Sequence, residues 1–193
     1  MLCFLSFGLA QPAVDPSSDQ LYKSMRFYET MWRLEEEKKP KGDWGWIPNS
    51  KNFDEMFRIQ GVLEKRAQLG EAKASFYAGI LALETANMYA KTYSKQSSLY
   101  EENYDVALRH FKQAGNAGFP SGYWNAAVMY EDGTGVMRSS TAAIELYFKA
   151  GLGYLGTNER EKALSSLEAI YRIDKNHELA KQLESQLKKA AVK

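Results

Sequence analysis

Cysteine and histidine are scarce in this chain, and their scarcity removes most of the chemistry on which a catalytic or metal site depends. The 193 residues include one cysteine, Cys3, and two histidines, His110 and His177. One thiol cannot form a disulfide within the chain, and neither histidine has a second ligand at metal-binding spacing. The acidic runs at 35–37 and 101–102 are typical of solvated faces, and no Gly-x-Ser-x-Gly, P-loop or His-Glu-x-x-His motif occurs. We therefore expect no enzyme activity, no cofactor and no metal.

The chain also lacks an excess of charge of either sign. Lysine and arginine number 25 and aspartate and glutamate 24, which gives a formal net charge of +1. Nucleic-acid-binding domains usually carry a basic face or stripe, so this balance predicts no nucleic-acid partner. Hydrophobic residues make up 45% of the chain and charged residues 25%, values typical of one globular domain or one short repeat array.

Long apolar runs are missing as well, so no stable membrane insertion is expected: a helix that spans a bilayer needs about 20 apolar residues. The apolar stretch at 1–10 is shorter, ends in the small residues Gly8 and Ala10, and precedes a polar, proline-containing stretch at 11–19. This pattern predicts a signal peptide over 1–10, although the usual basic start is missing, and a disordered linker over 11–19. The expected location is periplasmic or secreted. If the first segment is retained as an ordinary N-terminus, the location is cytoplasmic.

Proline is rare and falls at expected boundaries, and the stretches between prolines repeat apolar residues at helical spacing. No stretch alternates for long enough to predict a strand. Ser18 and Asp19 are suited to begin the first helix. We expect helices at about 20–39, 53–69, 72–93, 101–116, 121–131, 140–155, 159–173 and 176–190. The first and last would cap the two ends of the array.

The segment 121–151 contains the clearest sign of internal repetition. A helix with small and aromatic residues is followed by Tyr130-x-x-Gly133-x-Gly135-Val136, a short loop and a second helix with Ala-x-x-x-Tyr-x-Lys-Ala at 143–150. This pattern resembles the Sel1-like repeat, a relative of the tetratricopeptide repeat. A weaker copy spans 72–119, and Gly118 near its end lies 48 residues after Gly70, which lies just before this copy. The segment 150–180 is closer to a tetratricopeptide repeat.

The resemblance covers about 52–190. It implies an all-α fold, a right-handed α-solenoid of antiparallel helix pairs with about eight helices, preceded by a capping helix and tryptophan-containing loop at 20–51. The stretch at 129–136 could be read as a ligand loop or as a turn. The resemblance favours the turn, in which Gly133 and Gly135 take positive φ while Tyr130 and Val136 pack on the core.

In the proteins that the chain resembles, the first helix of each pair lines a groove that binds a peptide or a protein. Carrying this over by repeat position predicts three sets of groove residues, and the resemblance implies that Asn125 grips a peptide backbone. The alternative is that these positions are merely solvated or packed. The three sets are Lys73, Tyr77, Ile80 and Glu84; Ser121, Asn125, Val128 and Glu131; and Glu145, Lys149 and Leu152.

The loop at 42–48 holds two tryptophans, Trp44 and Trp46, between glycines and a proline. They are either an anchor for a partner or a lid packed over the first layer of helices. The expected function is a protein-binding adaptor or scaffold, in a bacterial envelope as the resemblance implies. The alternatives are a secreted effector or inhibitor acting on a host or competitor protein, and a hydrolase.

Overall fold

The computed structural model describes residues 16–36, 50–92 and 98–190. The predicted signal segment and the loop with Trp44 and Trp46 lie outside these ranges. Within them the chain is all-α, without a strand. Its eight helices are α1 (Ser18–Glu36), α2 (Ser50–Gln68), α3 (Ala72–Thr92), α4 (Ser98–Asn116), α5 (Pro120–Asp132), α6 (Ser140–Gly156), α7 (Arg160–Ile173) and α8 (Glu178–Ala190).

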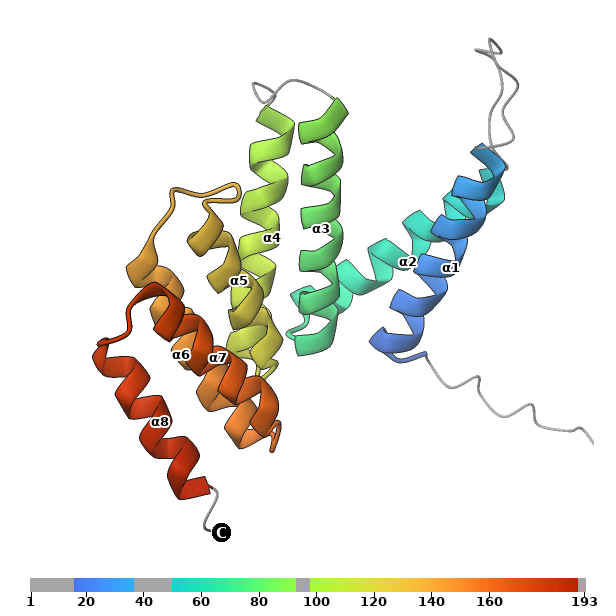
Figure 1. Cartoon of the computed structure of the whole chain (residues 1–193). Helices are drawn as coiled ribbons and strands as arrows, with labels where there is room; N and C mark the ends of the chain where they lie inside the picture. Colours follow the sequence, from blue (N-terminus) through green and yellow to red (C-terminus); the bar gives the residue numbers. More distant parts are fainter. Residues whose placement is uncertain (1–15, 37–49, 93–97, 191–193) are drawn as a thin grey trace, which may run out of the picture.

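Successive helices pack against each other along the whole array, as Figure 1 shows. The helices form antiparallel pairs, α1 with α2 through α7 with α8, and neighbouring pairs also touch through α1 with α3 and α6 with α8. This arrangement confirms the predicted all-α, solenoid-like fold. None of the helices in the described ranges combines the length and the apolar character required to cross a membrane.

The three connections between pairs are built alike. Each joins two helices through only three residues, 69–71, 117–119 and 157–159. The middle residue has positive φ: +88° at Gly70, +90° at Gly118 and +61° at Asn158. At each turn its N–H donates to the carbonyl three residues back, and the next N–H donates to the carbonyl five residues back. These two bonds define the Schellman motif, which satisfies carbonyls left open at a helix end.

Side-chain caps explain where two of the helices begin. Helix α1 begins at Ser18 because Ser17 is the N-cap: its Oγ accepts from the N–H of Gln20 at 3.3 Å, and Gln20 Oε1 accepts from the N–H of Ser17 at 2.7 Å. This reciprocal pair is a capping box. Helix α8 begins at Glu178 because Nδ1 of His177 accepts from the N–H of Leu179 at 3.2 Å.

The apolar interior consists of two clusters that meet in α3. The smaller cluster joins α1 and α2 to the first half of α3 and includes Leu21, Leu63 and Ala78. The larger cluster begins at Ala82 in the second half of α3 and continues through α4 to α8 as far as Leu187. Helix α3 is therefore the apolar link between the first pair and the rest of the array.

The stretch 129–136 is a turn, as predicted. Gly133 ends α5 with φ +72° and donates to the carbonyl of Met129, while Tyr130 and Val136 pack against the larger cluster. Gly135 has φ +67°, and a Cβ at this position would lie 2.1 Å from Cβ of Tyr104 on α4. The turn therefore also lies against the preceding pair.

This close approach predicts a difference between two substitutions that share the same backbone strain. Gly135→Ala and Gly70→Ala both place a side chain at positive φ, but a Cβ at Gly70 has no neighbour within 4 Å. We expect Gly70→Ala to lower the free energy of unfolding by about 1–2 kcal/mol. Gly135→Ala should lower it by about 1–3 kcal/mol more, because the turn must move off Tyr104. Urea unfolding of the two variants measures the difference, and equal losses would contradict the contact.

Candidate functional site

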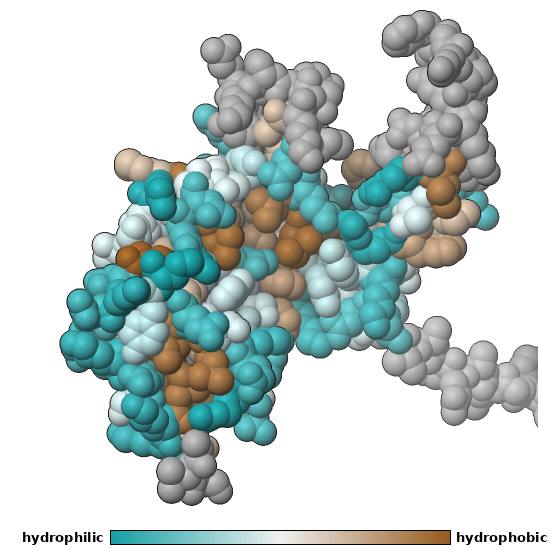
Figure 2. Space-filling model, viewed as in Figure 1, coloured by the Kyte–Doolittle hydropathy of each residue, from teal (hydrophilic) through white to brown (hydrophobic). Residues whose placement is uncertain are grey.

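We use the term inner face for the surfaces of the first helices of the pairs, α1, α3, α5 and α7. Polar side chains cross it between neighbouring pairs. Those of α1 meet α3 through Asp19 and Arg26, and Glu131 of α5 meets Arg172 of α7. Figure 2 shows apolar residues in the middle of this view, over α3 and α4, and a second group at lower left, near α7 and α8, with hydrophilic residues around both.

Two of the predicted groove residues on α3 are held by Asp19 of α1. The ammonium of Lys73 lies 2.5 Å from Oδ2 of Asp19, and the hydroxyl of Tyr77 donates to Oδ1 at 2.6 Å. These bonds, chiefly the one from Lys73, hold the pKa of the Asp19 carboxyl below its usual value. Tyr77 also stacks on Tyr22, with ring centroids 4.3 Å apart. The first turn of α1 therefore occupies this end of α3.

The third predicted groove residue on α3 is engaged in the same way. Both carboxylate oxygens of Glu84 lie near Nη1 of Arg26, at 3.1 and 2.9 Å. Burial raises the pKa of Glu84, and the guanidinium of Arg26 opposes that rise. The fourth residue, Ile80, is half-buried against the larger core cluster. Most of the α3 residues that were predicted to bind a ligand are therefore already in contact with other residues of this chain.

A second group of polar contacts joins α5, α6 and α7 around Glu131, and we call it the Glu131 clasp. Its carboxylate accepts from the hydroxyl of Tyr147 at 2.6 Å and from Nε and Nη2 of Arg172 at 2.8–3.0 Å. Tyr147 is fully buried. Burial raises the pKa of its hydroxyl, and the bond to Glu131 raises it further. Glu131 therefore fixes the far edge of the inner face.

Between these two sets of polar contacts, α3 and α5 are consecutive first helices, and we call the region between them the seam. Across the described parts of the chain, no hydrogen bond or ion pair joins these two helices. Partly buried apolar side chains of both helices pack against the larger core cluster, Phe76 and Ile80 on α3 and Trp124 and Val128 on α5. The seam is the part of the inner face that is least occupied by the chain's own polar contacts.

Asn125 lies near the middle of α5. The residue as a whole is half-buried. Its side chain makes no hydrogen bond within the described residues. Ser121, one turn earlier, is engaged, since its Oγ accepts from the hydroxyl of Tyr154 at 3.0 Å. Asn125 is therefore a predicted groove residue whose side-chain donors and acceptor have no hydrogen-bond partner among the described residues.

The third predicted set does not join the other two. Glu145, Lys149 and Leu152 lie on α6, the second helix of its pair, outside the inner face. The ammonium of Lys149 lies over the ring of Tyr123 at 5.7 Å, and Leu152 lines a separate groove of about 330 Å³ with α8. Sequence reasoning missed α7, although Arg172 faces α5. The helical spacing from Arg172 would have identified Glu168, Ser165 and Glu161.

Both histidines have contacts inside the fold. His110 is buried on α4, with Nε2 3.1 Å from Oε1 of Glu64 on α2, and His177 caps α8. Over the residues that the structure covers, no three side chains of the metal-ligating types gather into one group.

Comparison with protein-family models, with curated proteins and with solved structures found no match to this chain. What is established is the class: an all-α protein of stacked helix pairs with a solenoid-like arrangement. Its function has to be inferred from the surfaces of this array.

The clasp around Glu131 predicts a change in the alkaline stability of the protein. Below about pH 10 the Tyr147 hydroxyl is protonated in both the folded and the unfolded chain, so its contribution is constant. At higher pH the unfolded chain ionises first, because the pKa is raised in the fold, and the free energy of unfolding falls. Tyr147→Phe should therefore lose less stability than the wild type between neutral and alkaline pH, as measured by urea unfolding across a pH series.

The matched control is Tyr123→Phe, which removes a hydroxyl that donates to the neutral side chain of Asn116 at 2.6 Å. It should keep the wild-type decline at alkaline pH. If Tyr147→Phe also keeps that decline in full, the Glu131 clasp does not retain the tyrosine proton.

Proposed function

We propose that this protein is a non-enzymatic interaction module that binds an extended segment of another protein along the seam between α3 and α5. The observation that carries the proposal is the open carboxamide of Asn125 near the middle of α5. An asparagine side chain offers two donors and one acceptor, which suits both the N–H and the C=O of a peptide unit. The proteins that the sequence resembles place an asparagine at this repeat position for that purpose.

Burial makes this carboxamide effective. A half-buried polar group that lacks a partner loses part of its hydration without recovering a hydrogen bond. A peptide backbone laid across α5 would supply the missing partners. The apolar side chains beside Asn125, among them Trp124 and Val128, would meet the side chains of the same segment.

The clasps on either side support this function by fixing the seam. Asp19 and Arg26 hold α1 to α3, and Glu131 holds α5 to α7. A surface whose flanking helices are already fixed loses less conformational freedom when a ligand binds. The ligand would therefore bind to the open middle of the face, while the clasped ends act as its frame.

We further propose that the module works as an adaptor in a bacterial envelope. This placement depends on the apolar segment at 1–10 and on the family resemblance. N-terminal sequencing of the protein recovered from fractionated cells tests it. A new N-terminus after Ala10 in the periplasmic fraction is expected, and an intact Met1 in the cytosolic fraction would overturn the placement.

The binding proposal is tested with Asn125→Ala. Peptides selected from a random library against the whole chain should bind this variant about tenfold more weakly than the wild type. The reason is that the variant loses a neutral hydrogen-bonding group from the binding site. Tyr77 is a poor choice for the test because it anchors α1. Isothermal titration calorimetry gives the affinities.

The matched control is Asn176→Ala, in the turn between α7 and α8, where the side chain is exposed. It should bind the selected peptides as the wild type does. Peptides that bind all three proteins equally, or a selection that enriches nothing, would rule out the seam as the binding site.

A further inference from the structure

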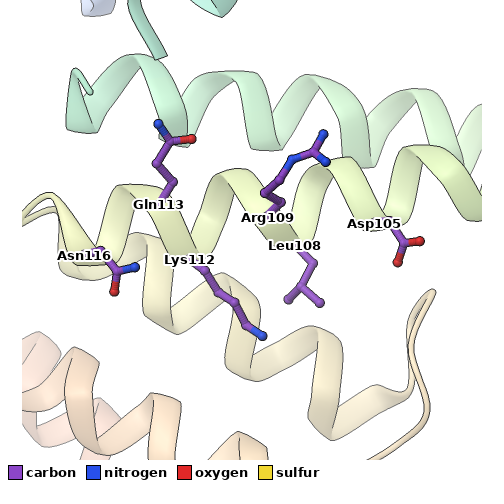
Figure 3. Close-up of a pocket in the computed structure, with 6 residues that line it drawn as sticks. All are labelled: Asp105, Leu108, Arg109, Lys112, Gln113 and Asn116. Carbon is purple, nitrogen blue, oxygen red and sulfur yellow. The ribbon is translucent and has the colours of Figure 1, made fainter. Parts of the chain in front are cut away.

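A second surface lies on the exposed side of α4, the second helix of its pair. We call it the α4 groove. It is a shallow hollow of about 550 Å³. The residues that line it recur every three to four positions, opposite the buried Ala107, Phe111 and Ala114 of the same helix. They are Asp105, Leu108, Arg109, Lys112, Gln113 and Asn116, drawn in Figure 3.

Among the residues that the structure describes, two cations of this groove have no acidic partner. Arg109 is exposed and forms no ion pair within the described chain. Lys112 is half-buried, and its ammonium donates to the neutral hydroxyl of Tyr130 at 3.0 Å. Elsewhere arginines such as Arg26 and Arg172 are paired with carboxylates. A cation that is partly withdrawn from water and meets only a neutral partner gains when a carboxylate approaches.

The other lining residues add donors and an apolar contact. The side-chain oxygen of Asn116 already accepts a hydrogen bond from the hydroxyl of Tyr123, so its amide N–H groups are the part that can donate to a ligand. Leu108 provides an apolar surface beside Lys112, as Figure 3 shows. The single carboxylate of the lining, Asp105, stands one helical turn from Arg109 without forming an ion pair with it.

The geometry sets how a ligand would lie. Figure 3 shows Arg109 and Gln113 extending to one side of α4 and Leu108 and Lys112 to the other. One small anion would not satisfy both cations from a single position on the helix. A chain that crosses α4 can place one carboxylate on each side and an apolar side chain on Leu108.

We propose that the α4 groove is a docking site for an acidic segment of a partner protein. Carboxylates of that segment pair with Arg109 and Lys112, and an apolar residue between them rests on Leu108. The site is independent of the seam between α3 and α5. With both surfaces in use, the array would hold two partners at once, one on each side of the helix layers.

The test uses the whole chain and a fluorescein-labelled synthetic peptide of glutamates interrupted by leucines, followed by fluorescence anisotropy. The variant Arg109→Gln with Lys112→Gln should bind this peptide about tenfold more weakly, because two charge-assisted contacts are lost. The variant Asp105→Asn should bind it more tightly, because a competing carboxylate is removed. These opposite changes on one helix are expected only if the peptide lies in the groove.

The matched control, Lys175→Gln with Lys189→Gln, removes the same charge from exposed lysines near the C-terminal end of the described array. It should change the affinity less than about twofold, since distant exposed charges are screened by salt. Equal weakening by both double variants would show binding through net charge alone and overturn the proposal. Unchanged binding by the Arg109 and Lys112 variant would overturn it as well.

Two further measurements keep the result decisive. If thermal unfolding shows that the double variant is destabilised, Arg109→Gln alone replaces it, because this exposed side chain has no ion pair to lose. A fluorescein-labelled single-stranded RNA of similar length is titrated in parallel. If the RNA binds with the same dependence on Arg109 and the peptide does not bind, the occupant is a nucleic acid and the proposal fails.

Discussion

The architecture depends on one backbone constraint, the reversal that leads from each helix pair into the next. Three residues suffice for it because the middle one adopts the left-handed conformation, which lets two consecutive N–H groups bond back to the helix that has just ended. A connection this short fixes both the separation and the angle of the helices that it joins. Repeating it at Gly70, Gly118 and Asn158 leads the chain from each pair into the first helix of the next in the same way.

Much of this could be predicted from the sequence, because its causes are local. Helical spacing of apolar residues located every helix within a few residues, and the breaks between the predicted helices contain all three reversals. The left-handed residue of the third reversal is Asn158, and asparagine tolerates this conformation. The turn at 129–136 was also predicted correctly, because Gly133 and Gly135 mark positions where the backbone adopts positive φ, which glycine tolerates.

The candidate site was less predictable, because it depends on which side chains meet across helices. Repeat position assigned Lys73, Tyr77 and Glu84 to the groove, but nothing in their spacing reveals that Asp19 and Arg26 reach them from a helix more than fifty residues earlier. The same limit hid the α4 groove. An exposed helix face with mixed charges reads as ordinary solvated surface, and only the structure shows which of its cations lack an acidic partner.

The position of α3 in both apolar clusters has a consequence for how the protein opens. The first pair of helices adheres to the rest through the early turns of α3 and through a few polar contacts, such as that of Glu64 with His110. Loss of these contacts releases α1 and α2 together and leaves the larger cluster intact. Amide hydrogens in this pair would then exchange with solvent through a shared partial opening, at a lower free energy than that of the later helices. We therefore expect two cooperative units, whose boundary lies in the middle of α3.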